Sequence, residues 1–192
     1  QRTVEGYLIA VQSMWERGLR GALAEREKKL CGGAALARIE RATWGGSAGT
    51  LQQHFRRLMG IPIEAFDSYK DLDLLQNLGS AIRHGDGNAA RRVHQLCPSL
   101  WFNWLAPGQE IVAGELRIKV PLSAPPHPSF ESISLPEATL EQMIQSVLWF
   151  WADMENIRCN SFRRKHHTVL QRLAAWGAER AQRTDRRVWN AC

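Results

Sequence analysis

Apolar residues recur at three- and four-residue steps along most of this chain, a spacing typical of helices that pack one face against a core. Residues 72–87 (LDLLQNLGSAIRHGDG) form the central stretch, because this run of leucines needs other helices around it. Thr50 is suited to begin a helix, whereas Gly32 and Gly60 are suited to end one. The pattern predicts helices over residues 4–29, 34–43, 51–59, 67–84, 89–96, 136–155 and 161–187. We therefore expect a mainly α protein, a helical bundle.

One segment departs from the helical pattern. Between residues 110 and 121, apolar and polar residues alternate around Gly114, which predicts two short strands in a hairpin. Residues 121–128 then contain four prolines in eight positions and read as a connecting loop. The sequence thus predicts a small β-hairpin insertion at about 108–122, within a β/Pro-rich insertion over 108–128. A chain of 192 residues suits one domain with its own core, so we expect residues 1–192 to form a single helical domain.

The net charge of +6 is concentrated near the C-terminus. Residues 158–192 hold nine Lys or Arg and two acids, whereas residues 1–157 hold 16 Lys or Arg and 17 acids. We expect a basic C-terminal helix over 158–192, with Asn160-Ser161 as its N-cap. A field of this kind attracts the phosphates of nucleic acid, although a solvated basic helix is the alternative. The predicted nucleic-acid-binding residues here are Arg163, Arg164, Lys165, His166, His167 and Arg172.

Cysteine spacing and hydropathy indicate an intracellular setting. The four cysteines are far apart and form no CxxC pair, so we expect no metal site, no cofactor and reduced thiols, as in a cytoplasmic protein. No apolar run reaches the roughly 20 residues that a membrane helix needs. We therefore expect no membrane partner.

The most promising chemistry lies at the end of the central helix, where Arg83-His84 precedes Gly85-Asp86-Gly87. Histidine can act as general acid or base, arginine binds phosphate, and Asp86 could orient the imidazole. Metal-free RNA cleavage needs a proton shuttle and a cation of this kind. However, neighbouring helical residues point about 100° apart. The alternative is that Arg83 and His84 simply complement the helix dipole.

A second set of candidates follows the glycine loop. If residues 89–96 are helical, Arg91 and His94 lie on one face, and together with Arg92 they could join His84 at the loop. We count His94 among the catalytic candidates, and Arg91 and Arg92 among those that bind phosphate. An ordinary solvated helix face is again the alternative.

Residues 78–87 (LGSAIRHGDG) resemble the RNxxxH segment of the HEPN superfamily of helical nucleotide-binding domains and RNases. In that segment an Arg, commonly followed by a polar residue, precedes a His at a helix end. His84 takes the place of the motif His and Ser80 that of the polar residue, whereas Gly79 stands where the Arg is expected. Either Arg83 supplies the cation from another turn, or the fold is retained without nuclease activity. The resemblance covers roughly residues 50–160 in pattern, and ten residues carry its specific part.

The resemblance implies a nucleic-acid-directed protein of a bacterial defence or toxin system, acting as a metal-independent endoribonuclease. It also implies a homodimer in which two motifs face one cleft, RNA or another nucleic acid as substrate, and a protein partner or antitoxin. The competing hypothesis is a non-catalytic subunit or regulator that binds nucleic acid or protein within a larger complex.

Overall fold

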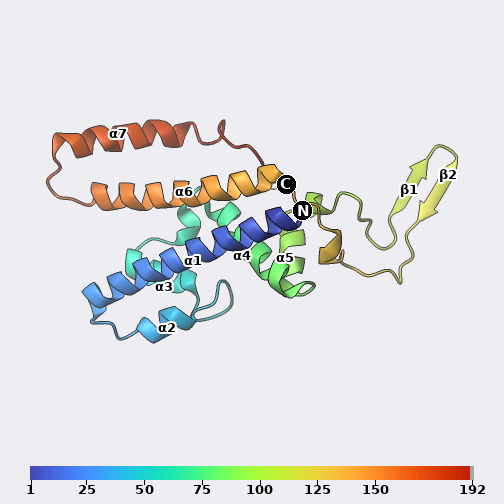
Figure 1. The fold of residues 1–192 in the computed structure, drawn as a ribbon, viewed down its shortest axis with the longest axis horizontal. Helices are drawn as coiled ribbons and strands as arrows, with labels where there is room; N and C mark the ends of the chain where they lie inside the picture. Colours follow the sequence, from blue (N-terminus) through green and yellow to red (C-terminus); the bar gives the residue numbers. More distant parts are fainter. Residues whose placement is uncertain (191–192) are drawn as a thin grey trace.

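Seven α-helices carry the fold of residues 1–190, the part of the chain that the computed structural model describes (Figure 1). They are α1 (Arg2–Cys31), α2 (Leu36–Arg41), α3 (Leu51–Met59), α4 (Tyr69–His84), α5 (Asn88–Leu96), α6 (Glu137–Asn160) and α7 (His167–Ala181), with short 3-10 turns η1 (Ile63–Ala65), η2 (Pro98–Trp101) and η3 (Phe130–Ser132) between them. Strands β1 (Glu110–Ala113) and β2 (Leu116–Lys119) form the only sheet in these residues. The mainly α fold with a small hairpin is confirmed. Within residues 1–190, no helix combines the length and apolarity needed to cross a membrane.

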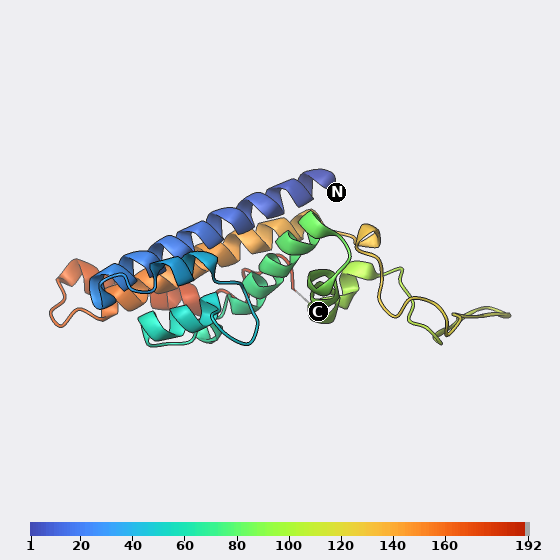
Figure 2. The ribbon, with the colours of Figure 1, turned by 90° about the horizontal axis from the view of Figure 1, so that it is seen from below.

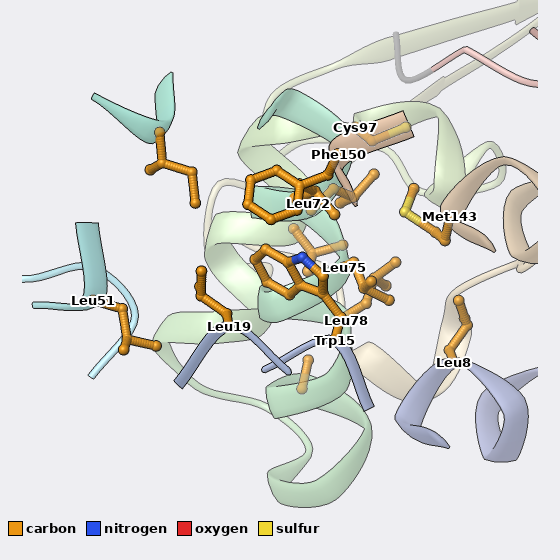
Figure 3. Packing of buried hydrophobic residues seen from close by; sticks show 14 of the residues in the cluster. Leu8, Trp15, Leu19, Leu51, Leu72, Leu75, Leu78, Cys97, Met143 and Phe150 are labelled. Carbon is orange, nitrogen blue, oxygen red and sulfur yellow. The ribbon is translucent and has the colours of Figure 1, made fainter. Parts of the chain in front are cut away.

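Helices α1, α4 and α6 pack against one another and enclose most of the core. Nearly the whole of α4 is buried between residues 71 and 81, as its run of leucines predicts. Trp15 from α1 and Phe150 from α6 meet edge to face, with ring centroids 5.9 Å apart. Figure 3 shows these two rings beside the leucines of α4. The central stretch is therefore the element around which the other helices are arranged.

The predicted helix ends are mostly correct where a local cap specifies them. Thr50 accepts a hydrogen bond from the Gln53 backbone N–H (3.2 Å), and the Gln53 side chain returns to the Thr50 backbone, which completes a capping box. Gly60 takes the left-handed conformation (φ 78°) that ends α3. Because both signals lie within a few residues of the helix, α3 has the predicted bounds.

Helix α2 is shorter than the predicted 34–43, and Arg20 of α1 accounts for its C-terminal end. The Arg20 guanidinium donates to the backbone carbonyls of Ile39 (2.7 Å), Glu40 (2.8 Å) and Ala42 (2.7 Å). These carbonyls lie at the end of α2, where helical partners run out. A residue far away in sequence thus stabilises this end of the helix.

The prediction of one helix over 161–187 is wrong. Helix α6 continues to Asn160, and the Ser161 hydroxyl donates to the Arg158 carbonyl (2.7 Å), so Ser161 belongs to the end of α6 and does not cap a new helix. Helix α7 begins only at residue 167, where the His166 ring nitrogen Nδ1 accepts from the Thr168 backbone N–H (3.4 Å). The expected 158–192 helix is therefore a helix end, a loop and a shorter helix. Its last two residues, including Cys192, lie outside the described part.

No residue of α7 is buried, and three ion pairs help to hold the C-terminal segment against the helical body, together with the packing of Trp189 on the core. Arg180 pairs with Asp67 (2.7 Å), Arg183 with Asp153 (2.8 Å) and Arg187 with Asp71 (2.8 Å). These three pairs join α7 and the turn after it to α4, α6 and the segment before α4. A substantial part of the positive charge counted in this segment is therefore neutralised within the protein.

The β1–β2 hairpin extends away from the helices in both views (Figures 1 and 2). Its strands are antiparallel, with Ile111 opposite Ile118 and Ala113 opposite Leu116. The isoleucines and Leu116 are exposed, so the hairpin adds no described side chain to the core. The predicted insertion is present at the expected position.

Candidate nucleic-acid interface

A polar cleft of about 910 Å³ lies between α1, α4, α5 and the loop after α2. Its charged lining consists of four arginines and two acids, Arg20, Arg41, Arg83, Arg92, Glu16 and Asp73. Neutral polar side chains and two aromatic rings, those of Trp44 and Tyr69, complete most of the wall. Four cations against two carboxylates leave a net charge of +2 around this cleft.

Arg83 is held toward the cleft by a buried amide of α1. Its guanidinium donates to Gln12 Oε1, and the Gln12 Nε2 donates to Gln76 Oε1 (2.8 Å) and to Glu16 Oε2 (2.5 Å). Gln12 is only 2% exposed. The Gln76 Nε2 has no partner among the described residues although the side chain is buried. The amide network thus positions Arg83 and leaves one donor unused at the cleft wall.

The glycine at position 79, where the HEPN resemblance expects an arginine, is explained by the same network. A Cβ atom at Gly79 would lie 2.9 Å from Gln12 Cγ, closer than side chains tolerate. Glycine therefore allows α1 and α4 to approach at this point. An arginine at this position would have to displace Gln12, so the cation at this turn of α4 is Arg83, four residues later.

Arg92 of α5 lines the same cleft and forms an ion pair there with Asp73 of α4. Asp73 accepts from Arg92 Nη2 (3.1 Å), from Trp44 Nε1 (2.9 Å) and from Asn77 Nδ2 (3.2 Å). The Arg92 side chain remains 49% exposed, while the Asp73 side chain is 11% exposed. A buried carboxylate thus holds Arg92 at one end and leaves the rest of its guanidinium open to a ligand.

The four arginines differ in how many donors they retain. Arg20 uses all of its donors on Glu16 and on the carbonyls at the end of α2. The Arg41 side chain, by contrast, makes no hydrogen bond or ion pair within residues 1–190. Arg83 and Arg92 each bind one internal acceptor. Three guanidinium groups, those of residues 41, 83 and 92, are therefore available to bind an anion.

His84 does not line this cleft. It is the last residue of α4 and is exposed, and no hydrogen bond joins its ring to another described residue. Asp86 does not orient it, because the Asp86 carboxylate accepts from the Phe130 backbone N–H (2.5 Å) and the Ser129 hydroxyl (3.2 Å). That carboxylate instead anchors the chain after the proline-rich loop. Arg83 and His84 diverge as the helical geometry predicts.

His94 lies among aromatic side chains. Its ring lies edge-on to Trp101 (5.4 Å between centroids) and Trp104 (4.9 Å), with His127 at 6.4 Å. Burial, and secondarily His127, lowers the pKa of His94 below its usual value. Aromatic packing thus positions His94, and that it acts together with His84 stays a prediction.

The neighbours Arg91 and Arg92 are separated by the same helix. Arg92 lines the polar cleft, whereas Arg91 lines a second cavity of about 550 Å³ beside Asp86, His127 and the proline-rich loop. Only Arg92 therefore shares a cleft with Arg83.

Of the predicted basic cluster, residues 163–166 lie in the loop between α6 and α7, and His167 and Arg172 lie in α7; this loop is at the opposite end of the molecule from the β1–β2 hairpin (Figures 1 and 2). Arg163, Arg164, His166 and His167 are exposed. Lys165 donates to the Phe162 carbonyl (2.9 Å), and the Arg172 guanidinium stacks on Trp176 at 5.0 Å. This loop is thus a basic region distinct from the cleft.

Sequence reasoning missed most of the cleft. The sequence patterns do not predict Gln12, Arg41, Trp44 or Asp73 as site residues. Two glutamines of the cleft, Gln12 and Gln76, could nevertheless be recognised from their positions in the sequence. Gln12 falls on the apolar stripe of the first helix, and Gln76 interrupts the leucines of the fourth. A polar residue at a core position needs a partner, which marks both as parts of a buried network.

Comparison with protein-family models, with curated proteins and with solved structures found no match to this chain. Among the described residues, no three His, Cys, Asp or Glu side chains gather as metal ligands do.

Proposed function

We propose that this protein binds nucleic acid, with RNA as its ligand, and that the cleft holds the phosphates. One observation carries the proposal: Arg41, Arg83 and Arg92 converge on a single cleft and keep donors free. Guanidinium groups bind phosphate oxygens through paired hydrogen bonds in a fixed geometry. The net positive charge of the cleft favours a polyanion over a neutral ligand.

The aromatic lining favours a single strand. Trp44 and Tyr69 are half-buried and line the cleft, and their ring centroids are 6.0 Å apart. Unpaired bases stack on such rings, whereas the bases of a duplex are already stacked within it. The basic loop around residues 163–167 adds a long-range attraction that salt weakens.

A second candidate function is metal-independent RNA cleavage, and the free ring of His84 favours it. An exposed imidazole with no internal hydrogen bond can take the proton of a 2′-hydroxyl or give one to the leaving oxygen. Because Arg83 turns away from it into the cleft, the cation beside His84 would come from a second copy of the chain. This is the homodimer that the HEPN resemblance implies.

Binding is tested with a fluorescent single-stranded RNA and the variant Arg92→Gln. Loss of one charged phosphate contact is worth about 1.5–3 kcal/mol, so we expect affinity to fall at least about tenfold. The slope of log K against log salt concentration should also become shallower by about 0.7. Arg91→Gln is the matched control, since Arg91 neighbours Arg92 on α5 but lies outside the cleft. Equal effects of the two variants would refute the cleft as the phosphate site.

Cleavage is tested with labelled RNA in EDTA beside His84→Ala. If the chain is a nuclease, the wild type cuts the RNA and His84→Ala binds it without cutting. If the wild type binds without cutting, the protein is the non-catalytic binding subunit.

A further inference from the structure

A second basic cavity lies on the other side of α2, between α2 and α3. Its volume is about 560 Å³, and Arg38, Arg41, Arg57 and His54 line it. Arg41 lines both this cavity and the polar cleft. The two cavities therefore adjoin each other through one cationic side chain.

The charge of this cavity is positive after its internal ion pair is counted. Arg57 pairs with Glu27, which is 1% exposed and also accepts from the Ala35 backbone N–H (2.9 Å). The Arg57 guanidinium holds the pKa of the Glu27 carboxyl below its usual range. The side chains of Arg38 and Arg41 make no hydrogen bond or ion pair within residues 1–190. Three cations against one carboxylate leave a net charge of +2 and two free guanidinium groups.

His54 brings a neutral hydrogen-bonding group to the same wall. It is 9% exposed, and its Nε2 has no hydrogen-bond partner among the described residues. Burial first, and then the positive charges of Arg57 and Arg38, lowers the pKa of His54. Two cations thus lie near the ring, and within residues 1–190 Arg57 is paired with Glu27 whereas Arg38 has no counterion. A buried polar group left in this state marks a place where a ligand can complete the bonding.

We propose that this cavity is a second phosphate-binding site, formed by Arg38, Arg57 and His54, with Arg41 shared between it and the cleft. A cavity of this size exceeds what one phosphate fills, which suits a phosphate within a larger molecule. A nucleic-acid strand held in the cleft would continue past Arg41 over α2. This continuation rests on the proposed function, whereas phosphate binding in the cavity itself does not.

Inorganic phosphate tests the site directly, with the NMR signals of the His54 ring as the readout, identified by their absence from His54→Gln. A bound anion favours the imidazolium, so phosphate should raise the pKa of His54 by about half a unit or more. Chloride at the same ionic strength should not. Arg38→Gln should abolish the phosphate effect. Arg56→Gln should preserve it, because Arg56 is exposed on α3, the helix that carries His54, and does not line the cavity. An unchanged His54 pKa, or equal behaviour of the two variants, overturns the site.

Binding of a short and a long oligoribonucleotide shows whether the cavity takes a phosphate of an RNA strand or free phosphate. We expect Arg83→Gln to weaken binding of both a dinucleotide and a strand of about 12 nucleotides. Arg38→Gln should weaken only the longer strand, by about 5- to 10-fold. If phosphate moves His54 but Arg38→Gln leaves the longer strand unaffected, the site serves free phosphate and the strand path is wrong. If Arg83→Gln has no effect while Arg38→Gln does, the cleft function fails and the second site stands.

Discussion

Replacing Arg187 by Ala should lower the free energy of unfolding by about 2–4 kcal/mol. Arg187 Nη2 lies 2.8 Å from Asp71 Oδ1, and Asp71 is 1% exposed. Without the guanidinium, the buried carboxylate keeps two donors among the described residues, the Ser146 hydroxyl (2.6 Å) and the Gln142 amide (3.2 Å). Breaking a fully buried pair costs about 3–5 kcal/mol. The Arg187 side chain is 21% exposed and two neutral donors remain, so we expect a loss near or below the lower end of that range.

Urea unfolding followed by tryptophan fluorescence measures this cost. The midpoint should fall at an unchanged slope, and a loss of about 3 kcal/mol corresponds to roughly 6–12 °C in Tm for a chain of this length. Arg186→Ala is the control, because Arg186 is exposed and its side chain binds only Gln182 (2.8 Å), so its effect should stay within about 0.5 kcal/mol.

A double-mutant cycle with Asp71→Asn decides whether charge is the cause. Once residue 71 is neutral, Arg187→Ala no longer leaves an uncompensated buried charge and should cost much less. If the cost is the same in both backgrounds, or if Arg186→Ala and Arg187→Ala shift the midpoint equally, the ion pair is not what holds the C-terminal segment.

Three further outcomes follow from the fold. Replacing residues 109–120 by a short Gly-Ser linker should change Tm by no more than about 2 °C, because the described hairpin side chains are exposed. Gly79→Arg should destabilise the protein by about 3 kcal/mol in urea, and it should not raise RNA cleavage, because it must displace Gln12. His127→Asn should raise the pKa of His94 in an NMR titration yet leave it below the usual value, since burial is the larger cause. The lowered pKa of His94 does not change the free energy of unfolding above pH ~6.5, where the ring is neutral in both states. The free energy of unfolding falls as the pH drops from there toward the pKa of the folded state, because the unfolded state binds the proton more readily.

Local signals explain why several elements could be predicted. Thr50 and Gly60 bracket α3 because a cap depends on atoms within a few residues of it. The leucine spacing predicts α4, and alternation predicts the hairpin. The end of α6 was predicted wrongly because the same kind of signal was ambiguous. Ser161 can cap a following helix or bind back to the preceding one, and it does the latter.

The cleft depends on contacts that no local pattern contains. Gln12 and Arg83 are 71 residues apart in sequence, and Trp44 and Asp73 are 29 apart. Adjacent residues proved poor partners, since the helix turns Arg83 away from His84 and Arg92 away from Arg91. Composition indicates a polyanion ligand but places it at the C-terminal charges, four of which pair with internal carboxylates.

By itself, the sequence determined the helical periodicity, the caps, the hairpin and the overall excess of positive charge, because each depends on spacing or on simple totals. Which guanidinium groups keep donors free for a ligand depends on packing between distant parts of the chain. A guanidinium is free or satisfied according to the acceptors around it, and packing places those acceptors. Thus residues 72–87 are the centre of the fold, as their leucines predict. The cleft that they help to form, where we propose that phosphate binds, needs Gln12, Arg41 and Arg92 from three other parts of the chain.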